Sequence, residues 1–178
     1  VSELSPHLNT VDEKMRIKKL RALQILHTES EPGFDNLAKL AGAIACTPLA
    51  AINLIARDEQ WCKAHHGWML DTIPRDESLC ALVVEKGSPI IAEDVKLSKR
   101  LLPRTQFYPG NEIRFYAGFP VIVENQAVGT VCVANTQRQE LTEEQINSLV
   151  MLANQVSHQL TIRERVAARK TENSDLLI

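Results

Sequence analysis

The stretch from Ile113 to Gln145, IRFYAGFPVIVENQAVGTVCVANTQRQELTEEQ, decides the fold of this chain. It holds two β-rich runs, Arg114–Val123 and Ala127–Asn135, on either side of a short polar turn, which predicts an antiparallel hairpin. Thr142 and Gln145 then form a capping-box pattern ahead of an apolar run, which predicts the start of a long helix. We therefore expect this part of the chain to be a hairpin that leads directly into a terminal helix.

The N-terminal third of the sequence predicts two more helices. A second capping-box pattern, from Thr10 to Glu13, opens a helix that is expected to run to about His27, before Glu31-Pro32-Gly33 breaks it. The next segment, FDNLAKLAGAIAC (residues 34–46), repeats its apolar residues at 3.6-residue spacing, which predicts an amphipathic helix.

The middle of the sequence predicts shorter elements. LAAINLIA (residues 49–56) is too continuously apolar to alternate, which indicates a central strand covered on both faces, and WCKAHHG (residues 61–67) returns as its antiparallel partner. Asp76 is the expected N-cap of a short helix through Lys86 that Gly87 ends, and PIIAEDV (residues 89–95) is a brief strand. Residues 67–76 are expected to form an irregular crossing, and residues 96–111 a long loop.

This order of elements predicts the fold class. It reads α, α, β, β, short α, β, long loop, β, β, α, and strands joined by tight turns give an antiparallel sheet. We therefore expect an α+β fold with a central antiparallel sheet, in which helices from the N- and C-terminal ends pack on one face and the middle elements cover the other. This arrangement is a three-layer α/β/α sandwich.

The composition is that of a single globular domain. The chain has 178 residues, 44% of them apolar, and a net charge of −2, which argues against a nucleic-acid binder. No apolar run approaches the ~20 residues that a membrane span requires, and the N-terminal residues show no hydrophobic signal core. The four cysteines, Cys46, Cys62, Cys80 and Cys132, form no CxxC pair, so we expect reduced thiols and a cytoplasmic location.

Five segments, taken in order, resemble the successive motifs of GAF domains: FDNLAKLA, DEQWCKAHHG, PRDESLCALVVEKGSPIIAEDV, IRFYAGFPV and VGTVCVANTQRQELTEEQ. The sequence is similar to the subgroup attached to bacterial diguanylate cyclases and histidine kinases, over roughly residues 13–165. It departs from that subgroup at Asn135, where Asp is usual, and at Gln137-Arg138, where Pro-Arg is usual. The resemblance implies one PAS-like GAF domain over residues 1–165, followed by a charged helical extension or disordered tail over residues 166–178.

The resemblance also implies a pocket on one face of the sheet, roofed by the short helix and the long loop. GAF pockets take cyclic nucleotides, tetrapyrroles, haem, amino acids or small metabolites, so neither the ligand nor a cofactor follows from the sequence. We expect a non-catalytic sensory module that binds a small molecule and passes the signal through its terminal helices. The ligand-binding residues expected from the resemblance are Trp61, His65, Ser78, Cys80, Asp94, Arg114 and Tyr116.

Two of these residues suggest the chemistry of a ligand. Arg114 and Tyr116 are two positions apart and share a face of a strand, so that with Asp94 nearby they are candidates for holding an anion or a carboxylate. The alternative is a structural ion pair between Arg114 and Asp94 that braces the loop.

Cys80 opens an alternative function. It lies near the first turn of the short helix, where the helix dipole lowers a thiol pKa, although Asp76 and Glu77 in the same turn act in the opposite direction. A small redox enzyme of the free methionine sulfoxide reductase type, also a GAF fold, would use such a thiol at Cys80 or Cys62. The simpler interpretation is a packed, unreactive cysteine, and a degenerate GAF domain that only dimerises is a third alternative.

Cys62, His65 and His66 do not predict a metal site. On an extended strand Cys62 and His66 share a face but stand about 13 Å apart, and Cys62 and His65 point to opposite faces. A shared zinc ion needs ligand atoms within about 2.3 Å of the metal. No cysteine is followed by His, the context that covalent bilin attachment uses in phytochrome-like GAF domains.

The last helix is expected to be an output element. From Thr142 to about Lys170 it would span about 43 Å, whereas the strands that it covers span only about 25 Å. Some 15 to 20 Å of helix would therefore project beyond the domain. We expect a parallel homodimer built on the terminal helices, and an effector such as a diguanylate cyclase or histidine kinase outside this chain.

Overall fold

The computed structural model of the protein describes residues 10–67, 72–105 and 112–175. Within them, six strands form one antiparallel sheet in the order β3-β2-β1-β6-β5-β4. The strands are β1 (Leu49–Ile55), β2 (Glu59–His66), β3 (Thr72–Pro74), β4 (Ile90–Ala92), β5 (Phe115–Val123) and β6 (Gln126–Asn135).

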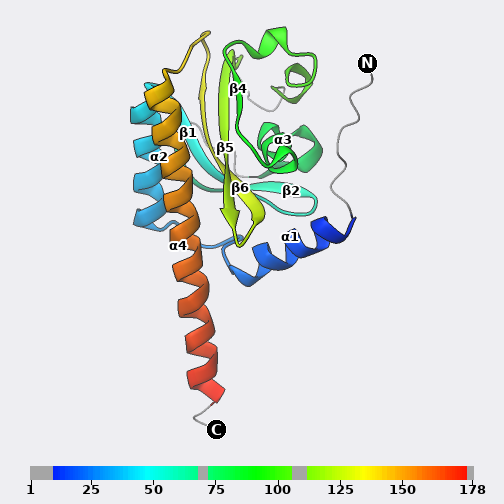
Figure 1. The fold of residues 1–178 in the computed structure, drawn as a ribbon, viewed down its shortest axis with the longest axis vertical. Coiled ribbons are helices and arrows are strands. Elements are labelled where there is room, and N and C mark those ends of the chain that lie inside the picture. The colour runs from blue at the N-terminus through cyan, green and yellow to red at the C-terminus, as the bar shows by residue number, and fades with distance from the viewer. Residues whose placement is uncertain (1–9, 68–71, 106–111, 176–178) are drawn as a thin grey trace.

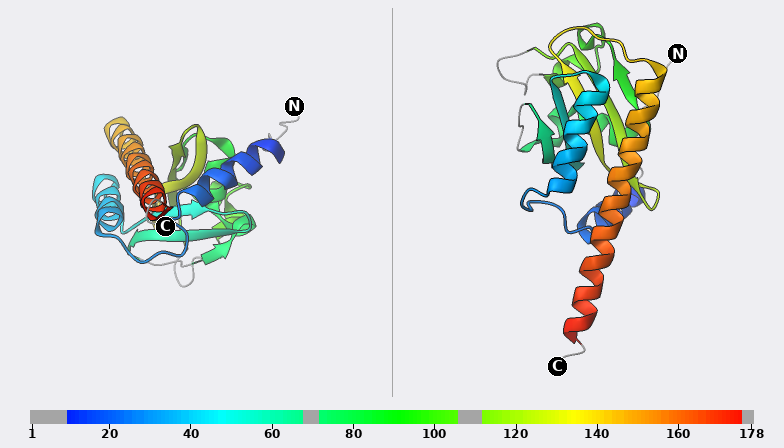
Figure 2. Two further views of the ribbon diagram at one scale, coloured as in Figure 1. Left: turned by 90° about the horizontal axis from the view of Figure 1, so that it is seen from below. Right: turned by 90° about the vertical axis from the view of Figure 1, so that its left-hand side faces the viewer.

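Helices cover both faces of this sheet (Figure 1). The α-helices are α1 (Thr10–Ala22), α2 (Pro32–Ala45), α3 (Leu79–Lys86) and α4 (Glu143–Asp175). Helices α2 and α4 lie side by side on one face, α3 packs on the other, and α1 crosses the end of the sheet (Figure 2). Short 3-10 turns at Arg75–Glu77, Val95–Leu97 and Leu102–Thr105 flank α3 and β4 in sequence. The predicted α+β three-layer sandwich is confirmed, with α2 rather than α1 as the main neighbour of α4.

Strand β1 is central, as its apolar sequence predicted. It pairs with β2 on one side and β6 on the other, so every backbone polar group along it has a ladder partner available. Its side chains alternate between two separate cores. Ile52 and Leu54 join the core under α2 and α4, whereas Ile55 joins the core under α3.

The capping box that opens α4 is confirmed. The backbone N–H of Gln145 donates to Thr142 Oγ1 at 3.2 Å, and the Gln145 side chain accepts from the Thr142 N–H at 2.9 Å. These reciprocal bonds satisfy two backbone donors that a helix N-terminus would otherwise expose.

Two predicted helix boundaries are wrong. Helix α1 ends at Ala22 rather than near His27, because Gln24 and His27 adopt positive φ angles of 49° and 57°. The N-cap of α3 is Ser78 rather than Asp76, which lies in the preceding 3-10 turn. The Ser78 hydroxyl accepts from the N–H of Ala81 at 2.9 Å, and Gly87 ends the helix as expected.

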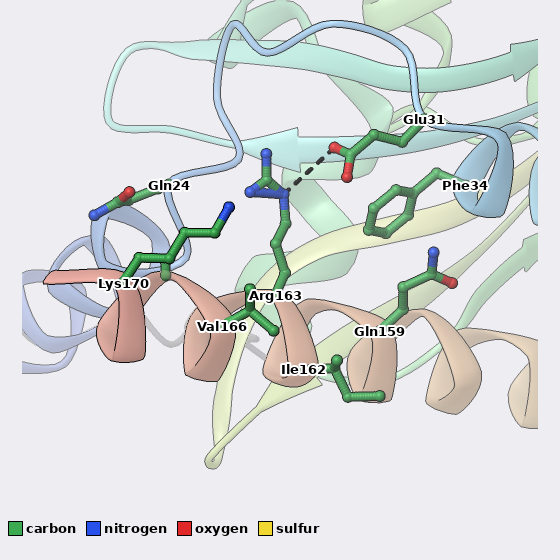
Figure 3. Close-up of a pocket in the computed structure, with 9 residues that line it drawn as sticks. Gln24, Glu31, Phe34, Gln159, Ile162, Arg163, Val166 and Lys170 are labelled. Carbon is green, nitrogen blue, oxygen red and sulfur yellow. Dashed lines mark ion pairs between the residues drawn. The ribbon is translucent and has the colours of Figure 1, made fainter. Parts of the chain in front are cut away.

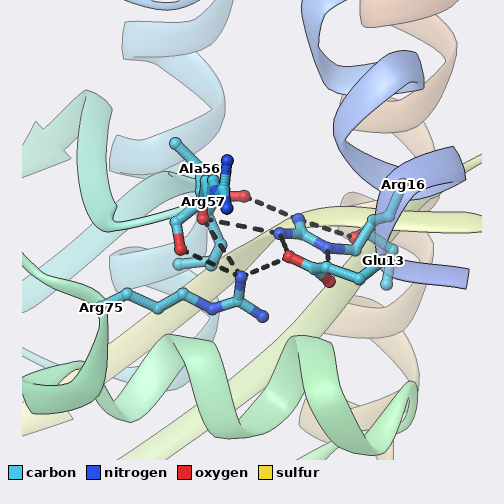
Figure 4. Close-up of polar contacts among 7 residues, drawn as sticks. Glu13, Arg16, Ala56, Arg57 and Arg75 are labelled. Carbon is cyan, nitrogen blue, oxygen red and sulfur yellow. Dashed lines mark hydrogen bonds and ion pairs between the residues drawn. The ribbon is translucent and has the colours of Figure 1, made fainter. Parts of the chain in front are cut away.

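Helix α1 is held to the sheet by a buried arginine (Figure 4). Arg16 is only 2% exposed, and its guanidinium donates to the Ile55 carbonyl at 2.6 Å and to both carboxylate oxygens of Glu13 at 2.8 and 2.9 Å. Arg75, just before α3, pairs with the same carboxylate. One glutamate therefore joins α1, the end of β1 and the segment that leads into α3.

The described residues contain no helix that is both long and apolar enough to cross a membrane.

Substitution of Glu13 by Gln is expected to lower the free energy of unfolding at neutral pH by about 2 kcal/mol, because it weakens the partner of a buried guanidinium. Partial burial acts to raise the pKa of Glu13, but hydrogen bonds from Arg16 and Arg75, followed by their charges, lower it to about 2 from the ordinary 4.5. The contribution is therefore complete above about pH 4.5 and is lost as the pH falls towards 2.

Urea unfolding of wild type and Glu13→Gln at pH 7 and pH 3 measures this difference, which should shrink at the lower pH. Asp12→Asn, an exposed carboxylate one position away, is the matched control and should have little effect. Equal stability of wild type and Glu13→Gln at pH 7 would show that the cluster does not hold α1.

Candidate functional site

A cluster of buried polar side chains lies between α3 and the sheet. Cys80, on the first turn of α3, accepts from the Tyr116 hydroxyl at 3.2 Å and from the Asn53 amide nitrogen at 3.4 Å. The same amide nitrogen lies 3.5 Å from the sulfur of Cys132 on β6. Strands β1, β5 and β6 and helix α3 therefore each contribute one side chain to this thiol cluster.

The thiol cluster perturbs both cysteines. Burial acts to raise the pKa of Cys80, but its polar neighbours Cys132, Thr130, Tyr116 and Asn53 outweigh burial and lower the pKa to about 6. The contact with Cys80, followed by burial, raises the pKa of Cys132 well above its ordinary range. The two thiols titrate as a coupled pair, in which the pKa of Cys80 is lowered and that of Cys132 is raised.

Helix α3 is fixed over this cluster at its N-terminal end. The Ser78 hydroxyl donates to Gln60 Oε1 on β2 at 2.6 Å, and the two residues are buried. The guanidinium of Arg104, from the loop after β4, donates to the Ser78 carbonyl at 2.8 Å. The roof of the expected pocket is therefore tied both to the sheet and to the long loop.

Side chains fill the space directly under α3. Residues 79–84 of this helix are all at most 3% exposed. Gly118 on β5 makes room for the Tyr116 ring, because a Cβ at Gly118 would overlap the Tyr116 hydroxyl and lie 2.7 Å from Val83 Cγ2. A ligand on this face would therefore lie beside α3 and not directly beneath it.

Arg114 and Asp94 form the ion pair that was the structural alternative to an anion site. Arg114 Nε donates to Asp94 Oδ1 at 2.9 Å, and a second guanidinium nitrogen pairs with the other carboxylate oxygen. The hydrogen bond from Arg114 is the main reason that the pKa of Asp94 is lowered to about 2. Tyr116 does not join this pair, because its hydroxyl contacts Cys80 instead.

A β-bulge in β2 corrects the predicted faces of its residues. The pairing register shifts between Ile52 and Asn53 of β1, so that Cys62 pairs with Asn53 and His65 with Ala51, while Lys63 is the extra residue. Residues paired in this way share a face, and Asn53 contacts the thiol cluster, so Cys62 and His65 both face the α3 side. The prediction that they point to opposite faces is wrong.

Trp61 lies on the other face of the sheet. It packs against the core under α2 and α4, with its ring 5.6 Å from that of His27. Trp61 is therefore separated by the sheet from the ligand-binding residues that were expected on the α3 face. Among the described residues, no group of three His, Cys, Asp or Glu side chains is placed to hold a metal ion.

The family model of the GAF domain matches residues 26–160. The chain belongs to the GAF domain family. It is 27% identical over 127 residues to the cyclic di-GMP phosphodiesterase PA2567 of Pseudomonas aeruginosa, which corresponds to 71% of this chain and 22% of that protein. The chain therefore spans about a fifth of the length of this relative.

Solved structures share this GAF fold. The domain of a putative two-component sensor histidine kinase from Sinorhizobium meliloti superposes with a TM-score of 0.65, at 15% identity, covering 80% of this chain and 98% of that one. Free methionine-R-sulfoxide reductase from Neisseria meningitidis gives 0.61 at 15% identity, covering 87% and 93%. At these identities the likeness concerns the fold alone. GAF domains are commonly sensory or regulatory modules.

A groove lies at the point where α4 leaves the domain (Figure 3). This groove has a volume of about 600 Å³, and its walls come from α4 and the connection between α1 and α2; it is lined by Gln24, Glu31, Phe34, Gln159, Ile162, Arg163, Val166, Ala167 and Lys170. Glu31 pairs there with Arg163 at 3.4 Å and with the buried Lys63 at 2.6 Å.

Sequence reasoning missed Asn53 and Cys132. The signal for Asn53 was present, because it is the one amide in the apolar run LAAINLIA, and a buried polar side chain requires partners. Cys132 gave no such signal, since only the strand pairing of β6 with β1 brings it to Asn53 and Cys80.

The substitution Gly118→Ala is expected to destabilise the protein by about 1–3 kcal/mol, because the added methyl group overlaps Tyr116 and Val83. In a Tyr116→Phe background the cost should be smaller, since the overlapping hydroxyl is gone. Urea unfolding of the four proteins measures the coupling. If Gly118→Ala cost the same free energy in the wild type and in the Tyr116→Phe background, the close packing of Gly118 against the Tyr116 hydroxyl would be contradicted.

Proposed function

We propose that this GAF domain is a cytoplasmic, non-catalytic sensory module that binds a small molecule on the α3 face of its sheet and transmits the event through α1 and α4 to an effector domain. The observation that carries this proposal is the position of α1, which contacts both the segment leading into α3 and the output helix. The homology to a cyclic di-GMP phosphodiesterase and the shared fold of a sensor kinase domain support the class of effector.

The connection through α1 is made of charged contacts. At one end Glu13 pairs with Arg75, three residues before the N-cap of α3. Two turns further along α1, Lys19 pairs with Glu164 of α4 at 3.0 Å and with Glu124 of the β5–β6 turn at 2.7 Å. A shift of α3 would therefore change contacts that reach α4.

Helix α4 has the form of an output element. Leu160 is the last buried residue of α4 among those whose side chains the structure describes, and also the last residue that the family model matches. The helix continues for another 15 residues to Asp175, about 22 Å, and its C-terminal end projects past the body of the domain (Figure 2).

The ligand site is proposed on the α3 face beside the thiol cluster. His65 is exposed there, Cys62 is half-buried, and Cys132 and Ala134 retain small exposed fractions. Ser78 and Cys80, at the N-terminal end of α3, and Tyr116 of β5 would border this site, and the Asp94–Arg114 pair would brace the loop. Trp61 is not included, because it lies on the opposite face.

Native mass spectrometry of the purified protein is expected to show a co-purifying small molecule bound to the folded chain. After the molecule is removed, peptides from residues 161–175 should exchange deuterium at a different rate, because the link through α1 is altered. If native mass spectrometry shows only the mass of the polypeptide, and the treatment that removes small molecules leaves deuterium exchange unchanged, the sensory proposal is contradicted. A GAF domain that only dimerises would then be favoured, which is also consistent with the filled space under α3.

We further propose that two copies associate in parallel along α4. Past Leu160 the helix is marginal in isolation, and Ile162 and Val166 are 61% and 48% exposed, four residues apart on one side. They line the groove described above, which a helix of the second copy would cover.

Light scattering at high protein concentration is expected to give a dimer for the wild type and a monomer for the double variant Ile162→Asp and Val166→Asp. Ala168→Asp is the matched control, because Ala168 is exposed on the far side of the same helix and should leave the dimer intact. A wild-type monomer at all concentrations would contradict the proposal.

A thiol enzyme is the second candidate, favoured by the lowered pKa of Cys80 and the fold shared with methionine sulfoxide reductase. Its difficulty is access, since Cys80 has no exposed surface. Reduction of free methionine sulfoxide that is lost in Cys80→Ser and retained in Cys46→Ser would select this candidate over the sensory module.

A further inference from the structure

The two buried cysteines at the contact between α3 and the sheet are placed as a reactive pair and not as two separate packing residues. Both sulfurs lie within 3.5 Å of the single amide nitrogen of Asn53. They come from different layers, because Cys80 belongs to the roof helix α3 and Cys132 to strand β6 of the sheet.

The environment of Cys80 is suited to a thiolate. Tyr116 and Asn53 both donate to its sulfur, which stabilises the anion more than the neutral thiol. These donors and Cys132 lower its pKa, as described above. A packed cysteine without such donors has its pKa raised by burial and is inert.

The pair also has an opening to solvent. Cys132 retains 8% of its exposed surface, and on the same face of the sheet Cys62 is half-buried and His65 exposed. A small oxidant would therefore approach the pair from the side of Cys132, because Cys80 itself has no exposed surface.

We propose that Cys80 and Cys132 form a reversible disulfide in response to hydrogen peroxide, which fastens the roof helix α3 to strand β6. This goes beyond the proposed function, since it gives the domain a chemical input that requires no bound ligand. All four cysteines are free in the structure, so both thiols are available for this reaction.

The reaction has two balanced steps. The Cys80 thiolate attacks one peroxide oxygen, so that a sulfur–oxygen bond forms, the oxygen–oxygen bond breaks and the departing hydroxide takes a proton from solvent to become water. Cys132 then attacks the Cys80 sulfenic acid, a sulfur–sulfur bond forms, and the hydroxyl group leaves as a second water with the Cys132 proton. The two thiols lose two electrons and peroxide gains them. A dithiol such as dithiothreitol reverses the change by thiol–disulfide exchange.

The test is peptide mapping of the purified protein after brief exposure to hydrogen peroxide, with remaining thiols alkylated under denaturing conditions. The expected result is a crosslinked peptide pair containing Cys80 and Cys132, two hydrogens lighter than the reduced pair and removed by dithiothreitol. Cys46→Ser, which removes an exposed cysteine, should leave the yield unchanged, whereas Cys80→Ser and Cys132→Ser should abolish it.

Wild-type mapping decides the outcome even if a serine variant fails to fold. Alkylation of both Cys80 and Cys132 after peroxide treatment, or a crosslink that joins Cys46 or Cys62 instead, would overturn the proposal. The oxidised protein should also unfold at a higher urea concentration than the reduced protein, and an unchanged midpoint would contradict the attachment of α3 to the sheet. Neither measurement uses a ligand or an effector, so failure here leaves the sensory proposal standing.

Discussion

The burial of strand β1 on both faces is the constraint on which the other layers depend. Its apolar side chains separate two cores, one with α2 and α4 and one with α3, and its backbone pairs with β2 and β6. A strand in this position has no edge and no solvent-facing side, so a polar residue in it requires a partner. Asn53 is that residue, and its partners are the two cysteines.

The same constraint explains why polar groups occur where two layers meet. Arg16 donates to the carbonyl at the end of β1, and Glu13 accepts two further hydrogen bonds from the same guanidinium while pairing with Arg75. Lys63, the extra residue of the β2 bulge, has a fully buried side chain that is neutralised by Glu31. Among the described residues, the two buried cations, Arg16 and Lys63, therefore each connect elements that are distant in sequence.

Local patterns predicted the parts of the fold that depend on neighbouring residues. The hairpin, the Thr142–Gln145 capping box and the apolar β1 were predicted because their signals lie within a few positions of one another. Asp76 and Ser78 are both good N-caps, and the choice of Ser78 depends on its hydrogen bond to Gln60 across the sheet interface. The β2 bulge leaves no trace in composition, so the faces of Cys62 and His65 could not be predicted. The thiol cluster required the strand order, which no single segment contains.

Helix α4 runs without a break from the packed core into its projecting end, so the direction in which each projecting residue points is fixed relative to the domain. Each helical residue advances the chain by about 100°, so one residue inserted after Leu160 would swing Ile162, Glu164 and Val166 to another side of the rod. An insertion of about seven residues would nearly restore the original direction. Length variation at this point among proteins with the same continuous helix should therefore come in whole turns, because a partial turn would point the projecting surface in another direction relative to the domain.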